Sequence, residues 1–382
     1  MSSSISAPAR PVSLPARLPT LDGLRAIAIL LVVPHNLNLM FTFGGVAYPF
    51  VSALHRGWIG VQLFFVLSGF LITGILLDAR DSSGYYRSFF VRRVLRIFPL
   101  YYATLLVLFV LLPALGLLPS SFKRDTMVEL SHWAYFSNWY GAFHPGEAAV
   151  SHFWSLAVEE QFYLLWPFVI YRRSAEWVMR LCFAIAAAAL SLRVAMLLTG
   201  TPGIYTFLAT RMDALALGGA TAAAFRVPSA ASWTLNHRRF LLGASLLSLV
   251  AGAAISRGYY FTDPMTLSLG LTFLAVAFAL LVAAGVAADQ VGQAGWLGVL
   301  RWTFLRRVAK YSYAMYVLSV PLHFLVGKPL LSALGLDPGN SVVVGFTYII
   351  VGTALSFLAA AASFHLLEVH FLNLKDRFAP PL

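Results

Sequence analysis

The chain has 382 residues, of which 59% are hydrophobic and only 11% are charged, and its mean hydropathy is +0.78. A typical soluble domain has about 45–50% apolar and about 25% charged residues, so a soluble enzyme of this length would lack the polar surface that it needs. Disorder is excluded as well, because it requires low hydrophobicity. The composition therefore predicts an all-α polytopic membrane protein whose single helical bundle takes up most of the chain.

The net charge is +12, from 27 Lys and Arg against 15 Asp and Glu. Such a balance suggests nucleic acid as a partner of a soluble protein, but in a membrane protein it is typical of the loops that set orientation. We therefore expect no nucleic-acid partner. Cys182 is the only cysteine, which excludes an intrachain disulfide and a cysteine-rich metal site, and we expect no metal. Residues 1–20 lack the apolar core of a signal peptide.

Ten segments are candidates to cross a bilayer, whose core is about 30 Å thick and needs about 20 apolar residues per helix. They are 24–43, 58–77, 97–118, 156–171, 178–198, 207–225, 240–256, 265–286, 311–330 and 342–366. The fourth begins near Glu159 and Glu160 and the sixth contains Arg211 and Asp213, so these two are the weakest by hydropathy. Charge inside a membrane is costly and points to function.

Ten spans place both termini on one side of the membrane, and the basic residues indicate which side. With the termini in the cytoplasm, nineteen Lys and Arg lie in cytoplasmic segments and five on the opposite side, as the positive-inside rule requires. We expect a cytoplasmic tail at 1–20, a transmembrane domain at 21–370 and a second cytoplasmic tail at 371–382. The longest loop, 119–155, is expected outside, and its aromatic residues fit either an interfacial belt or a platform for a sugar.

Five motifs contain the residue types that carry chemistry. In the first, Leu21-Asp22-Gly23-Leu24-Arg25, Arg25 is followed by Pro34 and His35, and His35 lies about 15 Å further along a helix. Histidine is the usual general base near neutral pH. In the second, 57–72, small residues such as Gly60 and Gly69 are typical of close helix packing.

The third motif contains Arg92, Arg93 and Arg96, which fit either membrane anchoring or a clamp for phosphate groups. The fourth, 151–163, contains the adjacent carboxylates Glu159 and Glu160, which are expensive in a membrane unless paired or protonated. Arg211 and Asp213 are further candidates for pairing, and such a pair could be purely structural. The last comprises Lys310 to Tyr316, with Pro321 and His323 after it, and Glu368 and His370 close the final span.

Taken in order, these motifs resemble those of the membrane-bound acyltransferase family 3, the bacterial O-acyltransferases that modify surface polysaccharides and other glycans. The matching stretches are Leu-Asp-Gly-Leu-Arg at 21–25, Gly-Val-x-Leu-Phe-Phe-Val-Leu-Ser-Gly-Phe-Leu-Ile at 60–72, Phe-x-x-Arg-Arg-x-x-Arg-Ile at 89–97 (offset by one residue through Phe89-Phe90), Trp-Ser-Leu-x-Val-Glu-Glu-Gln-Phe-Tyr at 154–163 and Arg-x-Asp-Ala-Leu at 211–215. The resemblance covers about 21–378.

The resemblance implies a ten-helix bundle in the bacterial inner membrane. Such a protein takes an acyl group, usually acetyl, from cytoplasmic acyl-CoA to a hydroxyl of a surface or lipid-linked carbohydrate. It implies catalytic roles for His35, Arg25, Glu159 and Glu160, and binding of CoA phosphates by Arg92, Arg93 and Arg96. The residues expected to bind the acceptor are Trp154, Ser155, Arg211 and Asp213. Membrane lipids, and a separate periplasmic transferase in place of direct transfer, are the other partners expected.

Two positions depart from the family pattern. The family has ten residues between its Arg and His, whereas nine separate Arg25 from His35, so Asn36 holds the family register unless Pro34 distorts the helix. Ser319 stands where the family often has a histidine. A transporter or flippase of a lipid-linked glycan is the alternative function, although no inverted repeat favours it. The acceptor and the length of the acyl chain stay open.

Overall fold

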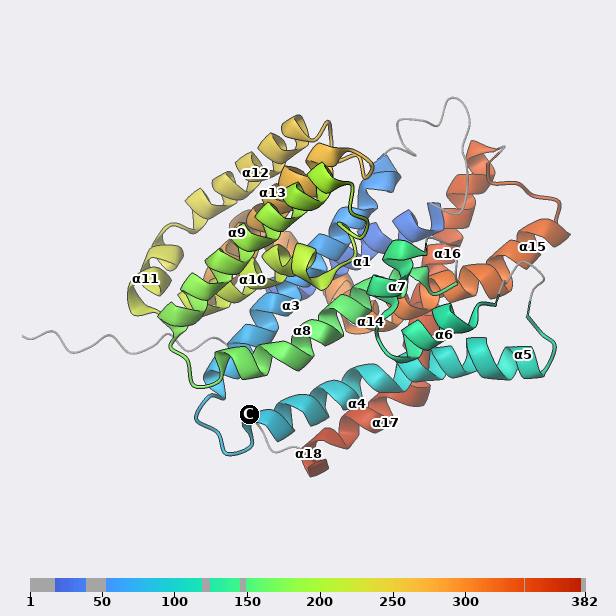
Figure 1. Ribbon diagram of the computed structural model, residues 1–382, viewed down its shortest axis with the longest axis horizontal. Helices are drawn as coiled ribbons and strands as arrows, with labels where there is room; N and C mark the ends of the chain where they lie inside the picture. Colours follow the sequence, from blue (N-terminus) through green and yellow to red (C-terminus); the bar gives the residue numbers. More distant parts are fainter. Residues whose placement is uncertain (1–17, 39–52, 119–123, 145–148, 340, 379–382) are drawn as a thin grey trace, which may run out of the picture.

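The computed structural model describes residues 18–38, 53–118, 124–144, 149–339 and 341–378, and every regular element in these ranges is a helix (Figure 1). This confirms the all-α fold. Residues 1–17 of the expected N-terminal tail, 39–43 of the first expected span and 379–382 of the C-terminal tail lie outside the described residues.

Ten long helices coincide with the ten expected spans. They are α1 (Pro19–Asn38), α3 (Ile59–Asp78), α4 (Tyr85–Leu106), α8 (Trp154–Ile170), α9 (Ala175–Thr199), α10 (Leu208–Ala224), α12 (Arg238–Ile255), α13 (Leu271–Val291), α14 (Thr303–Leu322) and α16 (Val342–Ser363). Turns of π-helix lengthen four of them: η3 (Val107–Leu111) and α5 (Leu112–Ala114) follow α4, η5 (Thr266–Gly270) precedes α13, η7 (His323–Gly327) and α15 (Lys328–Ala333) follow α14, and η8 (Phe364–Glu368) and α17 (Val369–Asn373) follow α16.

Short helices connect the long ones. They are η2 (Arg56–Trp58), α6 (Thr126–Trp133), α7 (Ser137–Phe143), η4 (Ser151–Phe153), α11 (Pro228–Asn236) and η6 (Gly295–Arg301), and a last short helix, α18 (Lys375–Phe378), follows α17. Among the described residues, eight helical segments are long and apolar enough to cross a membrane. The other two long helices, α8 and α10, have 17 residues each and are the same two that hydropathy marked as weakest.

Local sequence signals explain where several helices begin and end. Ser174 caps α9 by accepting a hydrogen bond from the backbone N–H of Trp177, and Ser341 caps α16 in the same way. Helix α9 ends at Gly200, whose φ of 65° lies in the left-handed region that glycine adopts without strain. These caps fix the lengths of the helices that surround the site.

Helix α3 lies at the centre of the bundle and packs closely on two neighbours. A Cβ added to Gly69 would lie 1.9 Å from the carbonyl oxygen of Leu215 in α10, and one added to Gly60 would lie 2.5 Å from that of Ala28 in α1. Glycine at these positions lets the helix backbones touch. The sequence-based interpretation of 57–72 as a packing motif is therefore confirmed at these two glycines.

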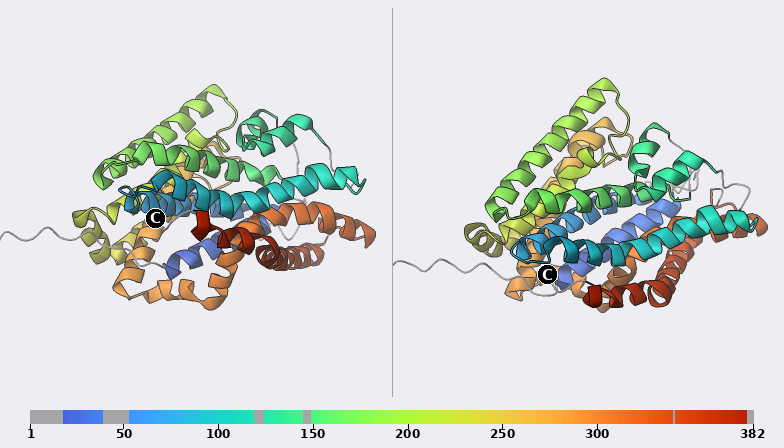
Figure 2. Two further views of the ribbon diagram at one scale, coloured as in Figure 1. Left: turned by 90° about the horizontal axis from the view of Figure 1, so that it is seen from below. Right: turned by 60° about the horizontal axis from the view of Figure 1, so that its bottom comes forward.

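The long helices form two groups around α3 and α1. Helices α9, α10, α12 and α13 lie on one side of α3, while α4 and α8 lie on the other (Figures 1 and 2). Helix α1 packs between α3 and α14, and α17 runs beside α4. This arrangement places α1, α3, α4 and α8 together, and these four helices carry most of the predicted site.

The part of the 119–155 segment that the structure describes folds back against the bundle. Arg124 Nη2 donates to the carbonyl of Phe109 over 3.1 Å, and further along α6 the carbonyl of His132 accepts from Tyr101 Oη over 2.8 Å. Helix α6 therefore runs antiparallel to α4 and reaches its middle. Reciprocal amide hydrogen bonds between Asn138 and Gln161, of 2.9 and 3.1 Å, join α7 to α8. Short helices at such depth are tolerated where protein encloses them.

Candidate active site

Charged side chains from α1, α4 and α8 gather around Glu159. Ser68 Oγ of α3 donates to Glu159 Oε1 over 2.6 Å, and Tyr163 Oη donates to Ser68 Oγ over 3.1 Å. Arg25 and Arg93 both interact electrostatically with the Glu159 carboxylate. The structure thus brings together Arg25 and Glu159, two of the predicted catalytic residues, which lie far apart in the sequence.

Glu160 lies beside this group, under a cluster of tyrosines. Its carboxylate interacts electrostatically with Arg93 and Glu159. The tyrosines that interact with Glu160 come from α4, α14 and the turn between α6 and α7, and they are Tyr101, Tyr102, Tyr135 and Tyr313. Both carboxylates are partly exposed, so they lie at an accessible surface within the bundle.

The arginines of α4 point in different directions. The guanidinium of Arg93 lies 5.1 Å from the ring centroid of Tyr163, a cation–π contact. Arg96 interacts electrostatically with Arg25 and with Glu368 of η8, whose carboxylate accepts from Ser363 Oγ over 3.2 Å. Arg92 lies on the same helix and is partly exposed. We call Arg25, Arg93, Arg96, Glu159, Glu160 and Glu368 the charged cluster.

His35 lies at the other end of α1, about 15 Å from Arg25 by the helical rise. It is 8% exposed and packs on the 54–57 segment, where a Cβ added to Gly57 would lie 2.7 Å from His35 Cβ. His35 Nδ1 is buried and finds no hydrogen-bond partner among the described residues. The imidazole is thus enclosed with one nitrogen available.

Helix α1 stays helical through Pro34, so the helical register is kept. Eleven residues at about 100° each bring Asn36 to within about 20° of the direction of Arg25, whereas His35 misses it by about 80°. Asn36 is 9% exposed, and its Nδ2 lacks a hydrogen-bond partner in the described part of the chain. The structure therefore keeps Asn36, and not His35, on the face of Arg25.

Arg211 is buried inside a cage of aromatic rings. Its guanidinium lies 4.7 Å from the ring centroid of Tyr205, 5.4 Å from that of Phe65 and 5.8 Å from that of Trp154. Arg211 Nη2 donates to Gln62 Oε1 over 2.5 Å, while Nε and Nη1 find no acceptor among the described residues. This cage leaves N–H donors of a buried cation unused.

Asp213 does not pair with Arg211. It forms a fully buried ion pair with Arg193 of α9, with 2.7 Å between Arg193 Nη2 and Asp213 Oδ2. The backbone N–H of Ala214 donates to the other carboxylate oxygen over 2.8 Å, and Thr272 Oγ1 lies 3.4 Å from Oδ2. Both oxygens are therefore engaged within the protein, and a role of Asp213 in binding substrate stays a prediction.

Ser155 belongs to a buried hydroxyl network next to the cage. Its Oγ lies 2.6 Å from Tyr316 Oη, which donates to the carbonyl of His152 over 2.7 Å. His152 Nε2 lies 2.9 Å from the carbonyl of Tyr316, and burial lowers the pKa of His152 to about 3. Burial also raises the pKa of Tyr205 to about 12, against the opposing effect of Arg211. These groups are neutral at physiological pH.

The described residues include no group of three or more His, Cys, Asp or Glu side chains placed to hold a metal ion. Ser319, at the position where the family often has histidine, is 1% exposed and donates to the carbonyl of Tyr316 over 3.2 Å. His323 points elsewhere, toward Tyr348 of α16. The candidate site therefore consists of the charged cluster, the Arg211 cage and His35.

Comparison with known proteins decides the family. The profile described as "Acyltransferase domain" matches residues 18–362, which includes the charged cluster except Glu368, the cage and His35. The chain belongs to the membrane-bound acyltransferase family 3. As a member of this family with eight helical segments that are long and apolar enough to cross a membrane among its described residues, it is a multi-pass membrane protein. No solved structure matches the chain.

Two relatives of this chain carry names that refer to peptidoglycan. A Bacillus subtilis protein named "Putative peptidoglycan O-acetyltransferase YrhL" is 31% identical over 92% of this chain and 54% of its own length. The Listeria monocytogenes protein named "Peptidoglycan O-acetyltransferase OatA" is 35% identical over 39% of this chain and 24% of its own length. The chain thus spans about half the length of the first relative and a quarter of the second.

Two parts of the candidate site were not predicted from the sequence. Glu368 was noted only as closing the last span, although a carboxylate beside an apolar run is itself a signal for a buried partner. Arg193 lies within the expected span 178–198 but was not predicted to have a role, and it forms an ion pair with Asp213. For Glu368 and for Arg193, the sequence shows that a charged residue lies in a membrane segment, but it does not show which residue of opposite charge is its partner.

Proposed function

We propose that this chain is a membrane O-acyltransferase that moves an acyl group, which we take to be acetyl, from acyl-CoA to a hydroxyl of a carbohydrate. The proposal places the enzyme in the bacterial inner membrane with both termini in the cytoplasm. One observation carries it: the charged cluster and the enclosed imidazole of His35 lie toward opposite ends of one helix, α1. Ten long helices and the distribution of Lys and Arg support the orientation.

The donor is assigned to the Arg25 end of the bundle. Arg92, Arg93 and Arg96 lie in the first half of α4, on the side expected to face the cytoplasm. Guanidinium groups bind phosphate oxygens through paired N–H donors, so these residues suit the phosphates of CoA. The flexible pantetheine arm would then carry the thioester into the bundle, away from the phosphates.

His35 is assigned as the general base that activates the acceptor hydroxyl. A neutral imidazole takes the hydroxyl proton as the oxygen attacks the thioester carbonyl, a C–O bond forms and the C–S bond breaks. The proton then passes to the leaving sulfur, which gives free CoA and the ester. His35 Nδ1, which lacks a partner among the described residues, is the atom available for this step, and such a base contributes about 10²–10⁴-fold.

Glu159, Glu160 and Arg25 are assigned to orient the donor. Ser68 and Tyr163 fix the Glu159 carboxylate in one direction, and Arg25 interacts with it electrostatically. Arg25 is too far along α1 to touch His35 directly. Its role is therefore to hold the carboxylate or the acyl donor and not to act on the base.

The acceptor is assigned to the Arg211 cage and its surroundings. The unused Nε and Nη1 donors of Arg211 suit an oxygen that gains negative charge, and Trp154 and Ser155 line the same region through Tyr205 and Tyr316. The relatives' names refer to peptidoglycan, which supports a glycan as the acceptor.

Release of CoA tests the proposal. Purified protein in vesicles, supplied with acetyl-CoA and a muropeptide or oligosaccharide acceptor, should form free CoA and acetylated sugar in equal amounts. A flippase of a lipid-linked glycan would leave acetyl-CoA intact. Absence of CoA release with every carbohydrate offered, from protein that remains folded, would contradict the proposed activity.

A further inference from the structure

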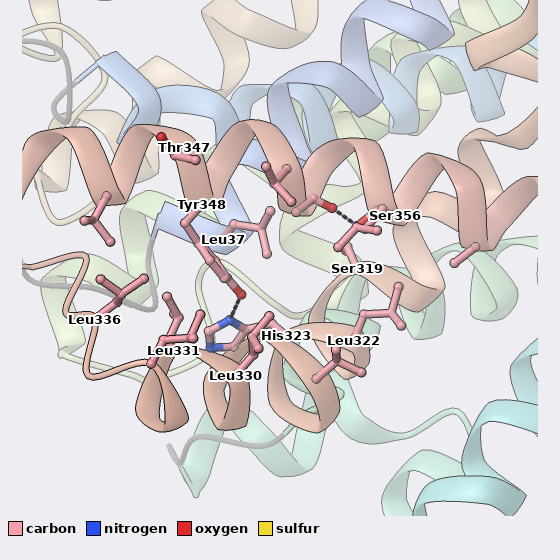
Figure 3. A pocket seen from close by; sticks show the side chains of 18 of the residues that line it. Leu37, Ser319, Leu322, His323, Leu330, Leu331, Leu336, Thr347, Tyr348 and Ser356 are labelled. Carbon is pink, nitrogen blue, oxygen red and sulfur yellow. Dashed lines mark hydrogen bonds between the residues drawn. The ribbon is translucent and has the colours of Figure 1, made fainter.

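A cavity of about 490 Å³ lies between α14–η7–α15 and α16, outside the residues discussed above as the site (Figure 3). Its lining is mostly Leu and Val, including Leu322, Leu330, Val351 and Leu355, and Leu37 at the end of α1 closes it on one side. Ligand sites have typical volumes of about 300–1,000 Å³ and mostly apolar walls. The size and the composition of this cavity therefore fit a ligand.

The backbone around the cavity departs from a regular α-helix. Helix α14 contains Pro321 and passes directly into the π-helical turn η7, which begins at His323. Such turns are rare and occur often at functional sites. Gly327 in this turn leaves room for Tyr348, because an added Cβ would lie 2.2 Å from Tyr348 Oη.

The cavity wall has few polar side chains, of which four form hydrogen bonds, while the fifth, Thr347, is exposed. His323 Nδ1 and Tyr348 Oη form a hydrogen bond across the cavity (Figure 3). Ser319 and Ser356 donate their hydroxyl protons to backbone carbonyls of their own helices. Among the described residues that line the cavity there is no Asp, Glu, Lys or Arg. A sugar or a CoA phosphate would find few polar partners in this cavity, whereas a hydrocarbon chain needs none.

The rim of the cavity faces outward from the bundle. Val326 is 51% exposed, Leu330 54%, Val351 48% and Leu355 49%. In a polytopic membrane protein these exposed apolar side chains meet the hydrocarbon of the bilayer. A hydrocarbon chain can therefore enter the cavity directly from the bilayer without crossing water.

The position of the cavity links it to the proposed acceptor. Leu37, which lines it, follows His35 by two residues on α1. We propose that the cavity holds the hydrocarbon chain of the lipid that carries the acceptor carbohydrate, so that the sugar is kept at the His35 end of α1. This inference rests on the proposed function, because it names the class of acceptor as lipid-linked.

A matched pair of variants on α16 tests the cavity. Val351→Trp fills it, while Ile350→Trp adds the same ring at the next residue, which is 64% exposed and outside the lining. With purified protein and polyprenyl phosphate as the probe, native mass spectrometry should show at least tenfold weaker binding to Val351→Trp and a change of less than twofold for Ile350→Trp. Leu355→Trp serves as a second filling variant should Val351→Trp fail to fold.

Two further measurements separate the possible results. Acetylation of a polyprenyl-linked sugar should fall tenfold or more in Val351→Trp, while acetylation of the same sugar without its chain stays within twofold of wild type. Equal binding of polyprenyl phosphate to both variants, or equal competition by phosphatidylglycerol, would overturn the assignment and make the cavity a site for bulk lipid. If binding depends on Val351 but no protein releases CoA, the lipid site stands and the acyltransferase proposal fails.

Discussion

Arg193 Nη2 lies 2.7 Å from Asp213 Oδ2, and neither side chain is exposed. The pair joins α9 to α10, while Arg211, two residues before Asp213 on α10, has no ion pair among the described residues. One buried carboxylate therefore serves as the partner of one of two buried guanidinium groups. Among the described residues, the Arg211 guanidinium therefore contacts aromatic rings and Gln62 and no carboxylate.

Removal of Asp213 should destabilise the protein strongly. Asp213→Ala leaves Arg193 buried without its partner, and the loss of one member of a buried pair costs about 3–5 kcal/mol. The free energy of unfolding in detergent measures this. Asp81→Ala is the control, since Asp81 pairs with Arg80 at the surface and such pairs contribute about 0–1 kcal/mol. Normal stability with lost activity would instead favour Asp213 as a substrate ligand.

The sequence was sufficient to predict the helical bundle, but it did not predict which side chains and short helices contact one another within it. Apolar runs of about 20 residues, the length that the bilayer sets for a span, located the ten long helices. Among the described residues, eight helical segments are long and apolar enough to cross a membrane. Helices α6 and α7 have 8 and 7 residues, too few for any span signal, so their return against α4 was not foreseen. Arg193 and Arg211 are equivalent by sequence as partners of Asp213, and only the packing of α9 on α10 chooses between them.

The arginines of α4 should control the requirement for acyl-CoA. Each charge-assisted hydrogen bond to a phosphate contributes about 1.5–3 kcal/mol, so Arg93→Ala should raise the KM for acetyl-CoA by about tenfold or more. Arg87→Ala, at an exposed position near the start of the same helix, should leave the KM unchanged. An unaltered KM in the single Ala variants of Arg92, Arg93 and Arg96 would reduce these residues to membrane anchoring.

The orientation can be measured with reporters. Because nineteen Lys and Arg fall on the side of the termini and five on the other, a reporter fused after residue 382 should behave as cytoplasmic. A second reporter inserted in the 200–207 turn between α9 and α10 should be active outside. A fusion at residue 382 that is active in the periplasm would refute this topology.

Acid should destabilise the protein through His152. Its pKa is about 3 in the folded chain against about 6.5 unfolded, so between these values the unfolded state binds the extra proton. The contribution of His152 to the free energy of unfolding is therefore fully present above pH 6.5. It is lost as the pH falls toward 3, by at most about 1.4 kcal/mol per pH unit for one proton. His152→Gln should show a shallower dependence in thermal unfolding, and His144→Gln, at an exposed position, should not. Identical pH profiles for wild type and His152→Gln would exclude this contribution.

We propose that His35 activates the acceptor hydroxyl, although Asn36 and not His35 lies on the face of α1 that carries Arg25. The most direct test is the rate of acetyl transfer from labelled acetyl-CoA to a carbohydrate acceptor, compared between His35→Ala and Asn36→Ala at equal amounts of folded protein in the membrane. Loss of the base should lower the rate of His35→Ala by about 10²–10⁴-fold, while Asn36→Ala keeps a rate within a few-fold of wild type. Near-normal turnover by His35→Ala would contradict the role of His35 as the general base. A severe loss of turnover in Asn36→Ala alone would show that the essential residue is Asn36, on the face of α1 that carries Arg25.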